Sequence, residues 1–155
     1  MDPQAVDWAA IPGPRWYQPE TVADAFTALL RGAGNDLNSG SGIRSTLGND
    51  HAGTLYPAAV AGTDVLLKIV TEHPGVPRQA ALWVLLDWWG CFLPEPGYEV
   101  YTGRDGNTID VIAAIIERVR QTVETLEAIA EQDAGARGLV RKLLRAQGQG
   151  WALTD

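Results

Sequence analysis

The side chains that could carry out chemistry are few and scattered along this sequence. The two histidines are His51 and His73, and the single cysteine is Cys91. A metal site or an acid–base pair would need the histidines together, yet they flank one predicted helix at residues 55–71. With a helical rise of about 1.5 Å per residue, they would lie roughly 25 Å apart. We therefore expect no metal site, no cofactor and no catalytic residue, and expect His51 to brace the start of that helix.

Cys91 and Asp87 both lie in the most apolar stretch of the chain, residues 77–92. Apolar surroundings raise the pKa of a thiol, so we expect Cys91 to be a buried structural residue and not a nucleophile. A buried carboxylate needs a partner, and Arg78, Arg44 or a tryptophan N–H could supply one for Asp87. This structural role is favoured. The alternative is a functional carboxylate at the edge of a pocket.

The same stretch, residues 77–92, predicts the central helix of the protein. It is apolar on nearly every side, so other elements must surround it. It is also too short, and too interrupted by Asp87, for a membrane span. Its adjacent Trp88 and Trp89 would point about 100° apart on a helix. One of the two could therefore reach a surface groove, and we take Trp88 as a candidate partner-binding residue.

Apolar residues recur at helical spacing along most of the remaining chain. Besides 77–92, the predicted helices are 19–31, 55–71, 108–132 and 134–147, with a short one at 42–47 inside the glycine-rich loop 33–54. The five residues 72–76 are a short connection, which predicts antiparallel packing of the helices on either side. Residues 98–102 alternate weakly but have no obvious strand partner. We predict an all-α fold of five to six helices, without strand pairing.

The predicted organisation is a single domain over residues 1–155. Residues 1–18 combine prolines with aromatic residues, which indicates an ordered arm laid over apolar surface. Residues 93–107 form a long inserted loop, and residues 148–155 form a tail that we expect to be loose unless Trp151 docks. The acidic, proline-broken start has no signal-peptide pattern, so we expect a cytoplasmic protein.

One segment carries a family likeness. His51, Gly53, Tyr56, Ala58 and Ala59 precede an alanine-rich helix, a proline-containing turn and a second apolar helix ending at 89. This segment resembles a unit of actinobacterial HEAT-repeat-like proteins. The resemblance implies antiparallel helical hairpins, arranged as an α-solenoid or compact bundle that binds proteins. The 93–107 insertion lengthens the repeat beyond its usual period of about 40–47 residues, so the length permits two or three hairpins.

The inserted loop 93–107 is the strongest candidate for recognition. Its aromatic and charged residues are Glu95, Tyr98, Glu99, Tyr101, Arg104 and Asp105. Tyrosines among charges are typical of recognition loops. A surface connector whose tyrosines pin it to the core would have the same composition, and both interpretations stay open.

The net charge of −7 and the pI of about 4.7 argue against a nucleic-acid binder and permit a basic protein partner. Glu124, Glu127 and Glu131 predict an acidic, solvent-facing ridge. We predict a non-enzymatic protein-binding module, most concretely an immunity protein that neutralises a cognate, basic bacterial toxin domain, with no nucleic acid or membrane as partner. The alternatives are a helical-repeat scaffold or regulatory adaptor, and a small enzyme or ligand-binding protein with a pocket near Asp87.

Overall fold

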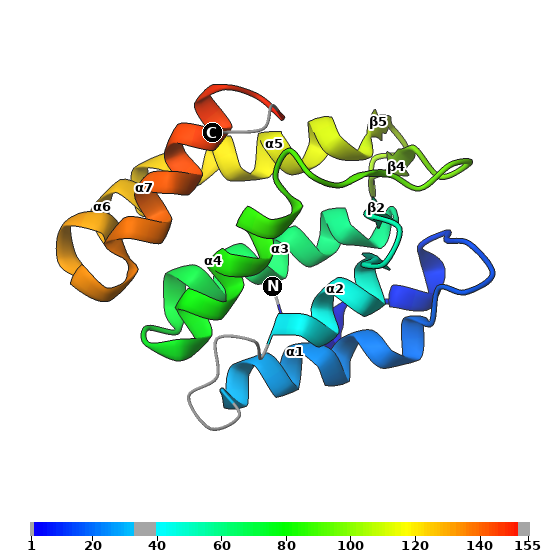
Figure 1. Cartoon of the computed structure of the whole chain (residues 1–155). Coiled ribbons are helices and arrows are strands. Elements are labelled where there is room, and N and C mark those ends of the chain that lie inside the picture. The colour runs from blue at the N-terminus through cyan, green and yellow to red at the C-terminus, as the bar shows by residue number, and fades with distance from the viewer. Residues whose placement is uncertain (1, 33–39, 152–155) are drawn as a thin grey trace.

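The computed structural model describes residues 2–32 and 40–151 and is mostly helical (Figure 1). Within these residues, the α-helices are α1 (Val22–Arg31), α2 (Ser41–Leu47), α3 (Ala58–Glu72), α4 (Val76–Trp88), α5 (Val111–Gln121), α6 (Val123–Gln132) and α7 (Ala134–Gly148). The all-α prediction is confirmed in this coarse form. The predicted count of five to six helices was too low, and small sheets accompany the helices. Residues 33–39 and 152–155, parts of the predicted loop and tail, lie outside the described residues.

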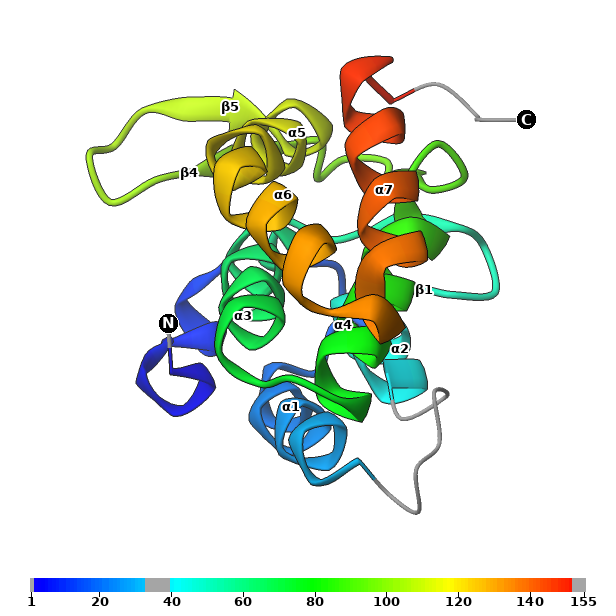
Figure 2. The same cartoon turned by 90° about the vertical axis from the view of Figure 1, so that its left-hand side faces the viewer.

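α3 and α4 form the central hairpin, with α1 and α2 on one side and α5, α6 and α7 on the other (Figures 1 and 2). The chain reverses at Gly75, whose positive φ of 89° favours glycine. Pro77 occupies the first turn of α4, where its missing N–H removes no helical hydrogen bond. Trp88 is 0% exposed and Trp89 is 5% exposed. The prediction of a buried central helix is therefore confirmed, with its end at Trp88 instead of residue 92.

The predicted helix 108–132 was wrong as a single element. Its first residues form strand β5 (Thr108–Asp110), and the Asp110 carboxylate caps α5 by accepting from the Ala113 N–H at 3.1 Å. A break at Thr122 then separates α5 from α6. The Thr122 hydroxyl donates to the Arg118 carbonyl, a local bond that competes with the helical backbone pattern.

Two small sheets contradict the expectation of no strand pairing. The first contains β1 (Gly48–Asn49), β2 (Thr54–Leu55) and β3 (Leu93–Pro94), paired antiparallel and then parallel. The second is a hairpin of β4 (Val100–Thr102) and β5. The missing partner of residues 98–102 is thus the segment 108–110, whose apolar spacing had extended the helical pattern.

An aromatic clasp ties the end of α7 to the end of α4. The Trp151 indole N–H donates to the Phe92 carbonyl at 2.8 Å, and the Trp89 indole N–H donates to the Gly150 carbonyl at 2.7 Å. The centroids of the two indole rings lie 4.7 Å apart. Trp151 therefore docks, as the prediction for the tail allowed.

The N-terminal arm contains two short 3₁₀-helices, Pro3–Ala5 and Trp8–Ala10, and a third, Pro19–Thr21, follows the arm and leads into α1. Trp8 is buried and stacks on Phe26 of α1 with 6.0 Å between ring centroids. The Tyr17 hydroxyl donates to the Trp8 carbonyl at 2.7 Å.

Among the described residues, none of the helices combines the length and apolar character that a membrane span needs.

Candidate functional site

The histidines and the cysteine do not form a common site. His51 is exposed in the turn between β1 and β2, so it does not brace α3 as expected, and His73 is exposed at the far end of α3. The buried role expected for Cys91 was wrong, because α4 ends before it and Gly90, at φ 77°, turns the chain outward. No group of three or more histidine, cysteine or carboxylate side chains within the described ranges is arranged to hold a metal ion.

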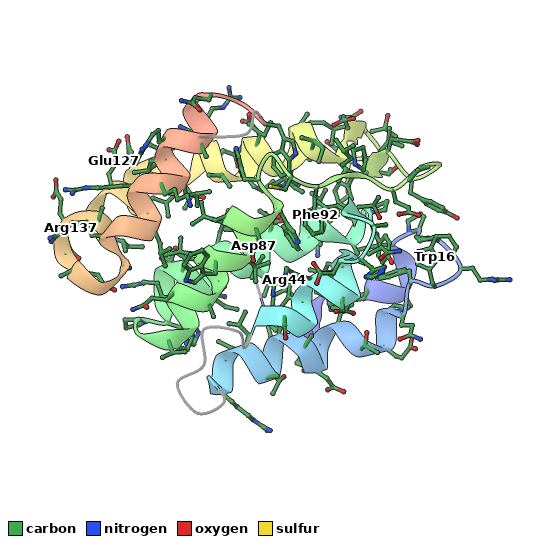
Figure 3. All side chains as sticks on the ribbon, viewed as in Figure 1. Trp16, Arg44, Asp87, Phe92, Glu127 and Arg137 are labelled. Atoms are coloured by element: carbon green, nitrogen blue, oxygen red, sulfur yellow. The ribbon has the colours of Figure 1, made fainter. Side chains whose placement is uncertain are left out.

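Asp87 pairs with one of the partners that the sequence suggested. Its carboxylate lies 2.7 Å from Nη1 of Arg44, and Nε of the same arginine lies 3.8 Å from Asp50 (Figure 3). The Asp87 side chain is 43% exposed. Burial raises the pKa of Asp87, and the positive charge of Arg44 opposes this shift. Asp87 thus links α4 to α2 through an ion pair.

Trp88 lies in the core and can contact no partner in this conformation. Its side chain is 0% exposed, and its indole N–H has no hydrogen-bond partner among the described residues. The helix rotation places Trp88 inward, while the chain leaves the helix at Trp89 and buries that ring in the clasp. The exposed tryptophan is instead Trp16 in the arm, at 53%.

A groove of about 630 Å³ runs between the N-terminal arm and the segment 97–104. Both project on the same side of α3 (Figure 2), and α3 forms the floor of the groove. One wall contains Tyr98, β4 and Arg104, and the opposite wall contains Val6, Asp7 and Ile11 of the arm. We call this feature the arm–hairpin groove. A second hollow of about 700 Å³, the hairpin cleft, adjoins it beneath β4 and β5.

The structure brings together only some of the predicted loop residues. Tyr98, Tyr101 and Arg104 line the arm–hairpin groove, and Asp105 lines the hairpin cleft. Glu99 is exposed beside them.

Glu95 lies apart from this group and is only 7% exposed. Its carboxylate accepts from the Thr54 hydroxyl, and its N–H donates to the Leu55 carbonyl at 2.9 Å. It therefore anchors the base of the loop and is not placed to contact a partner.

Tyr101 joins the groove to the helices beneath it. The Arg118 guanidinium lies over its ring, 5.9 Å from the centroid. Nε of Arg118 in turn lies 3.4 Å from the carboxylate of Asp64, on the groove floor. Burial raises the pKa of Asp64, and Arg118 partly offsets that shift. This ion pair holds α5, and with it the β4–β5 hairpin, against α3.

Short polar contacts shape the loop. The Glu99 carboxylate accepts from the Gly97 N–H at 2.8 Å, and backbone N–H donors lower its pKa. The Asp105 carboxylate accepts from the backbone N–H of Asn107 at 3.0 Å and from its side-chain amide at 3.0 Å. The groove wall is therefore organised before any partner arrives, which lowers the entropic cost of binding.

Two parts of the groove are not predicted from the sequence. The arm wall depends on a contact between distant segments, which residue spacing does not encode. The floor carboxylate, Asp64, had a weak signal, because it is the one charge in the apolar run 58–67 of α3. A charge inside an apolar helix often marks a paired or functional residue.

Comparison of the chain with models of known protein families, with curated proteins and with solved structures found no match. The chemistry that the groove offers is recognition: tyrosine rings, apolar arm residues and a few charges around an open hollow.

Proposed function

We propose that the protein is a non-enzymatic protein-binding module, and that in its most concrete form it is a cytoplasmic immunity protein that binds and neutralises a cognate bacterial toxin. The observation that carries this proposal is the arm–hairpin groove, which gathers Tyr98, Tyr101 and Arg104 opposite an arm wall that is apolar except for Asp7. Tyrosine and arginine are enriched among the residues that dominate binding energy at interfaces. An exposed apolar residue, Val100 at 54%, lies on the same wall.

Charge supports a basic partner. The protein carries a net charge of −7, and the groove contains the carboxylates of Asp7 and Asp64 and the guanidinium of Arg104. Arg118 forms an ion pair with Asp64 and offsets its negative charge. The accessible negative charge is therefore that of Asp7 in the groove and of Glu99, which is exposed next to it. Complementary charge speeds encounter and selects between partners, which suits an inhibitor of a basic toxin domain.

The helical frame supports the finer fold proposal, a compact arrangement of two or three HEAT-like hairpins. The α3–α4 hairpin lies within residues 51–89, where the chain resembles that family, and α6 with α7 forms a second hairpin through a one-residue turn at Asp133. An enzymatic role would need Asp87 to act on a ligand. Its ion pair with Arg44 favours the structural role instead.

The proposal predicts a toxin gene beside this one, and the test titrates that toxin domain against the purified protein by calorimetry. Tyr98→Ala should weaken binding about fivefold or more, since interface tyrosines often contribute at least about 1 kcal/mol. Glu127→Ala is the matched control, because Glu127 is exposed on α6, far from the groove (Figure 3). Absence of binding at micromolar concentrations, or equal losses in the two variants, would overturn the proposal.

A further inference from the structure

The outer edge of β4 is open, and it lies along the arm–hairpin groove. Two backbone hydrogen bonds close the ends of the β4–β5 hairpin. The Gly103 N–H donates to the Asn107 carbonyl, and the Val111 N–H donates to the Glu99 carbonyl, both at 2.9 Å. In an antiparallel pair, bonded residues alternate with residues whose N–H and C=O point outward. With this register, Tyr101 faces β5 through its backbone, whereas Val100 and Thr102 direct their N–H and C=O groups away from it.

These outward groups are available for pairing. Val100 and Thr102 are both exposed, and their backbone groups have no hydrogen-bond partner within residues 2–32 and 40–151. All of β4 lines the groove, while no residue of β5 does. The unpaired edge therefore borders the hollow that the arm encloses from the other side. An unpaired strand edge beside a groove is a template for an added strand.

We propose that the arm–hairpin groove binds an extended, basic segment of a partner protein, which adds to β4 as a third strand. This inference rests on the proposed function and names the binding mode at the same site. The backbone of the segment would bond to Val100 and Thr102. Its alternate side chains would point to the α3 floor, where Ala61 is small and leaves space, and outward past Asp7, which supplies negative charge.

Charge selects this occupant over a second copy of the chain. A copy with net charge −7 would be repelled by the like charge of the whole protein. Asp7 and the exposed Glu99 add accessible carboxylates at the groove, where Arg104 is the one basic lining residue among those that the structure describes. A lysine- or arginine-bearing strand would meet those carboxylates and the ring of Tyr98, on which a cation also binds favourably, whereas Arg118 already lies over the ring of Tyr101. The added strand would also cover the exposed edge, which otherwise invites nonspecific pairing.

The hairpin supplies its own matched variants. Thr102 and Thr108 face each other across it, both are exposed, and both direct their N–H outward, but only Thr102 lies in the groove. Thr102→Pro removes the N–H on the groove edge, and Thr108→Pro makes the same change on the opposite edge. Proline is tolerated on strand edges whose N–H faces solvent. Circular dichroism and thermal melts would verify that both variants fold.

The probe is a short capped peptide in which lysine and valine alternate, followed by fluorescence polarisation and amide hydrogen exchange. Binding should slow exchange at Val100 and Thr102 only, and Thr102→Pro should weaken it about fivefold to tenfold, the value of one hydrogen bond. Thr108→Pro should bind as wild type. A peptide with glutamate in place of lysine should not bind.

Several outcomes would overturn the inference. One is a basic peptide that fails to bind, or that slows amide exchange at Thr108 and Asp110 instead of at Val100 and Thr102. Another is that the two proline variants weaken peptide binding equally. A third is a free protein that forms a dimer in which the amides of Val100 and Thr102 are already protected from exchange. The toxin separates this inference from the proposed function. Toxin binding that falls with Tyr98→Ala but is equal for the two proline variants refutes strand addition alone. Toxin that does not bind refutes the proposed function.

Discussion

Arg78 joins three helices through one buried guanidinium. It is 8% exposed, and its Nε and Nη2 donate to the carbonyls of Val70 and Thr71 at 2.6 and 3.2 Å, at the end of α3. Its Nη1 donates to Asp133 at 2.7 Å, and Asp133 also caps α7. One side chain on α4 thereby satisfies helix-end carbonyls and fixes the start of the last helix.

Replacing Arg78 with methionine should lower the free energy of unfolding by about 3 kcal/mol, because the carbonyls of Val70 and Thr71 lose their donor and the ion pair with Asp133 is removed. The matched control is Arg141→Met, an exposed arginine on α7, for which we expect a change within about 0.5 kcal/mol. Urea unfolding followed by circular dichroism measures both values. Equal losses in the two variants would show that Arg78 has no special structural role.

The partner of Arg78 gives a pH prediction with a definite sign. The hydrogen bond from Arg78 lowers the pKa of Asp133 below its ordinary value of 3.8. A depressed carboxyl pKa contributes stability above 3.8, and this contribution is lost as the pH falls through the folded-state pKa. Asp133→Asn keeps a good N-cap and removes the charge.

The wild type should therefore be more stable than Asp133→Asn at neutral pH, and the difference should shrink in acid, below 3.8. Urea unfolding at a series of pH values measures this difference directly. A difference that stays constant with pH would contradict the assignment of the charge effect to this pair.

At the scale of elements, the bounds of a helix could be predicted from the sequence wherever an apolar stripe ended near a glycine or proline. α1, α3, α4 and α7 begin and end within a few residues of their predicted bounds, except that α4 stops four residues short. The segment 108–132 failed because Ile109 fits a helical stripe and a strand equally well. Residues 108–110 form a strand because they pair with β4, across the turn that Gly106 permits at φ 82°. Such pairing between segments has no local signal.

The same distinction applies to the candidate site. The loop 93–107 was predicted from its own composition, and Tyr98, Tyr101 and Arg104 do line the groove. The arm wall and the burial of Trp88 depend on tertiary packing, so composition could not locate them. Glu95 was misassigned because a carboxylate that bonds Thr54 looks, in sequence, like one that faces solvent.

The aromatic clasp is an element-level device with a measurable contribution. Trp151→Ala should cost about 2 kcal/mol of stability, below the 3–5 kcal/mol typical of fully buried tryptophan, because Trp151 is only half-buried. Trp16→Ala, at the 53% exposed tryptophan, should cost much less. Urea unfolding compares the two. A larger loss for Trp16 would mean that the clasp does not stabilise the end of α7.

At the scale of the whole molecule, charge is separated between faces. Glu124, Glu127 and Glu131 are exposed on α6, as the ridge prediction requires, whereas α7 exposes Arg141, Lys142 and Arg145. The groove carries Asp7, with Glu99 exposed beside it, whereas Asp64 is paired with Arg118, and Arg104 is the one basic residue that the described part of the chain adds to the lining. A basic partner approaching the groove is thus attracted by the net charge of −7 and kept from the basic face of α7.

Under the proposed function, this distribution of surface charge should affect the rate at which the toxin associates. Stopped-flow mixing with the basic toxin should show the association rate falling about tenfold or more as salt shortens the screening length from about 30 Å to about 8 Å. Asp7→Asn with Glu99→Gln should lower that rate at low salt, while Glu127→Gln, one charge on the remote α6 ridge, should change it less. Because rim charges act mainly on encounter, dissociation should change little in these variants. An association rate insensitive to salt would show that shape and strand pairing, and not charge, select the partner.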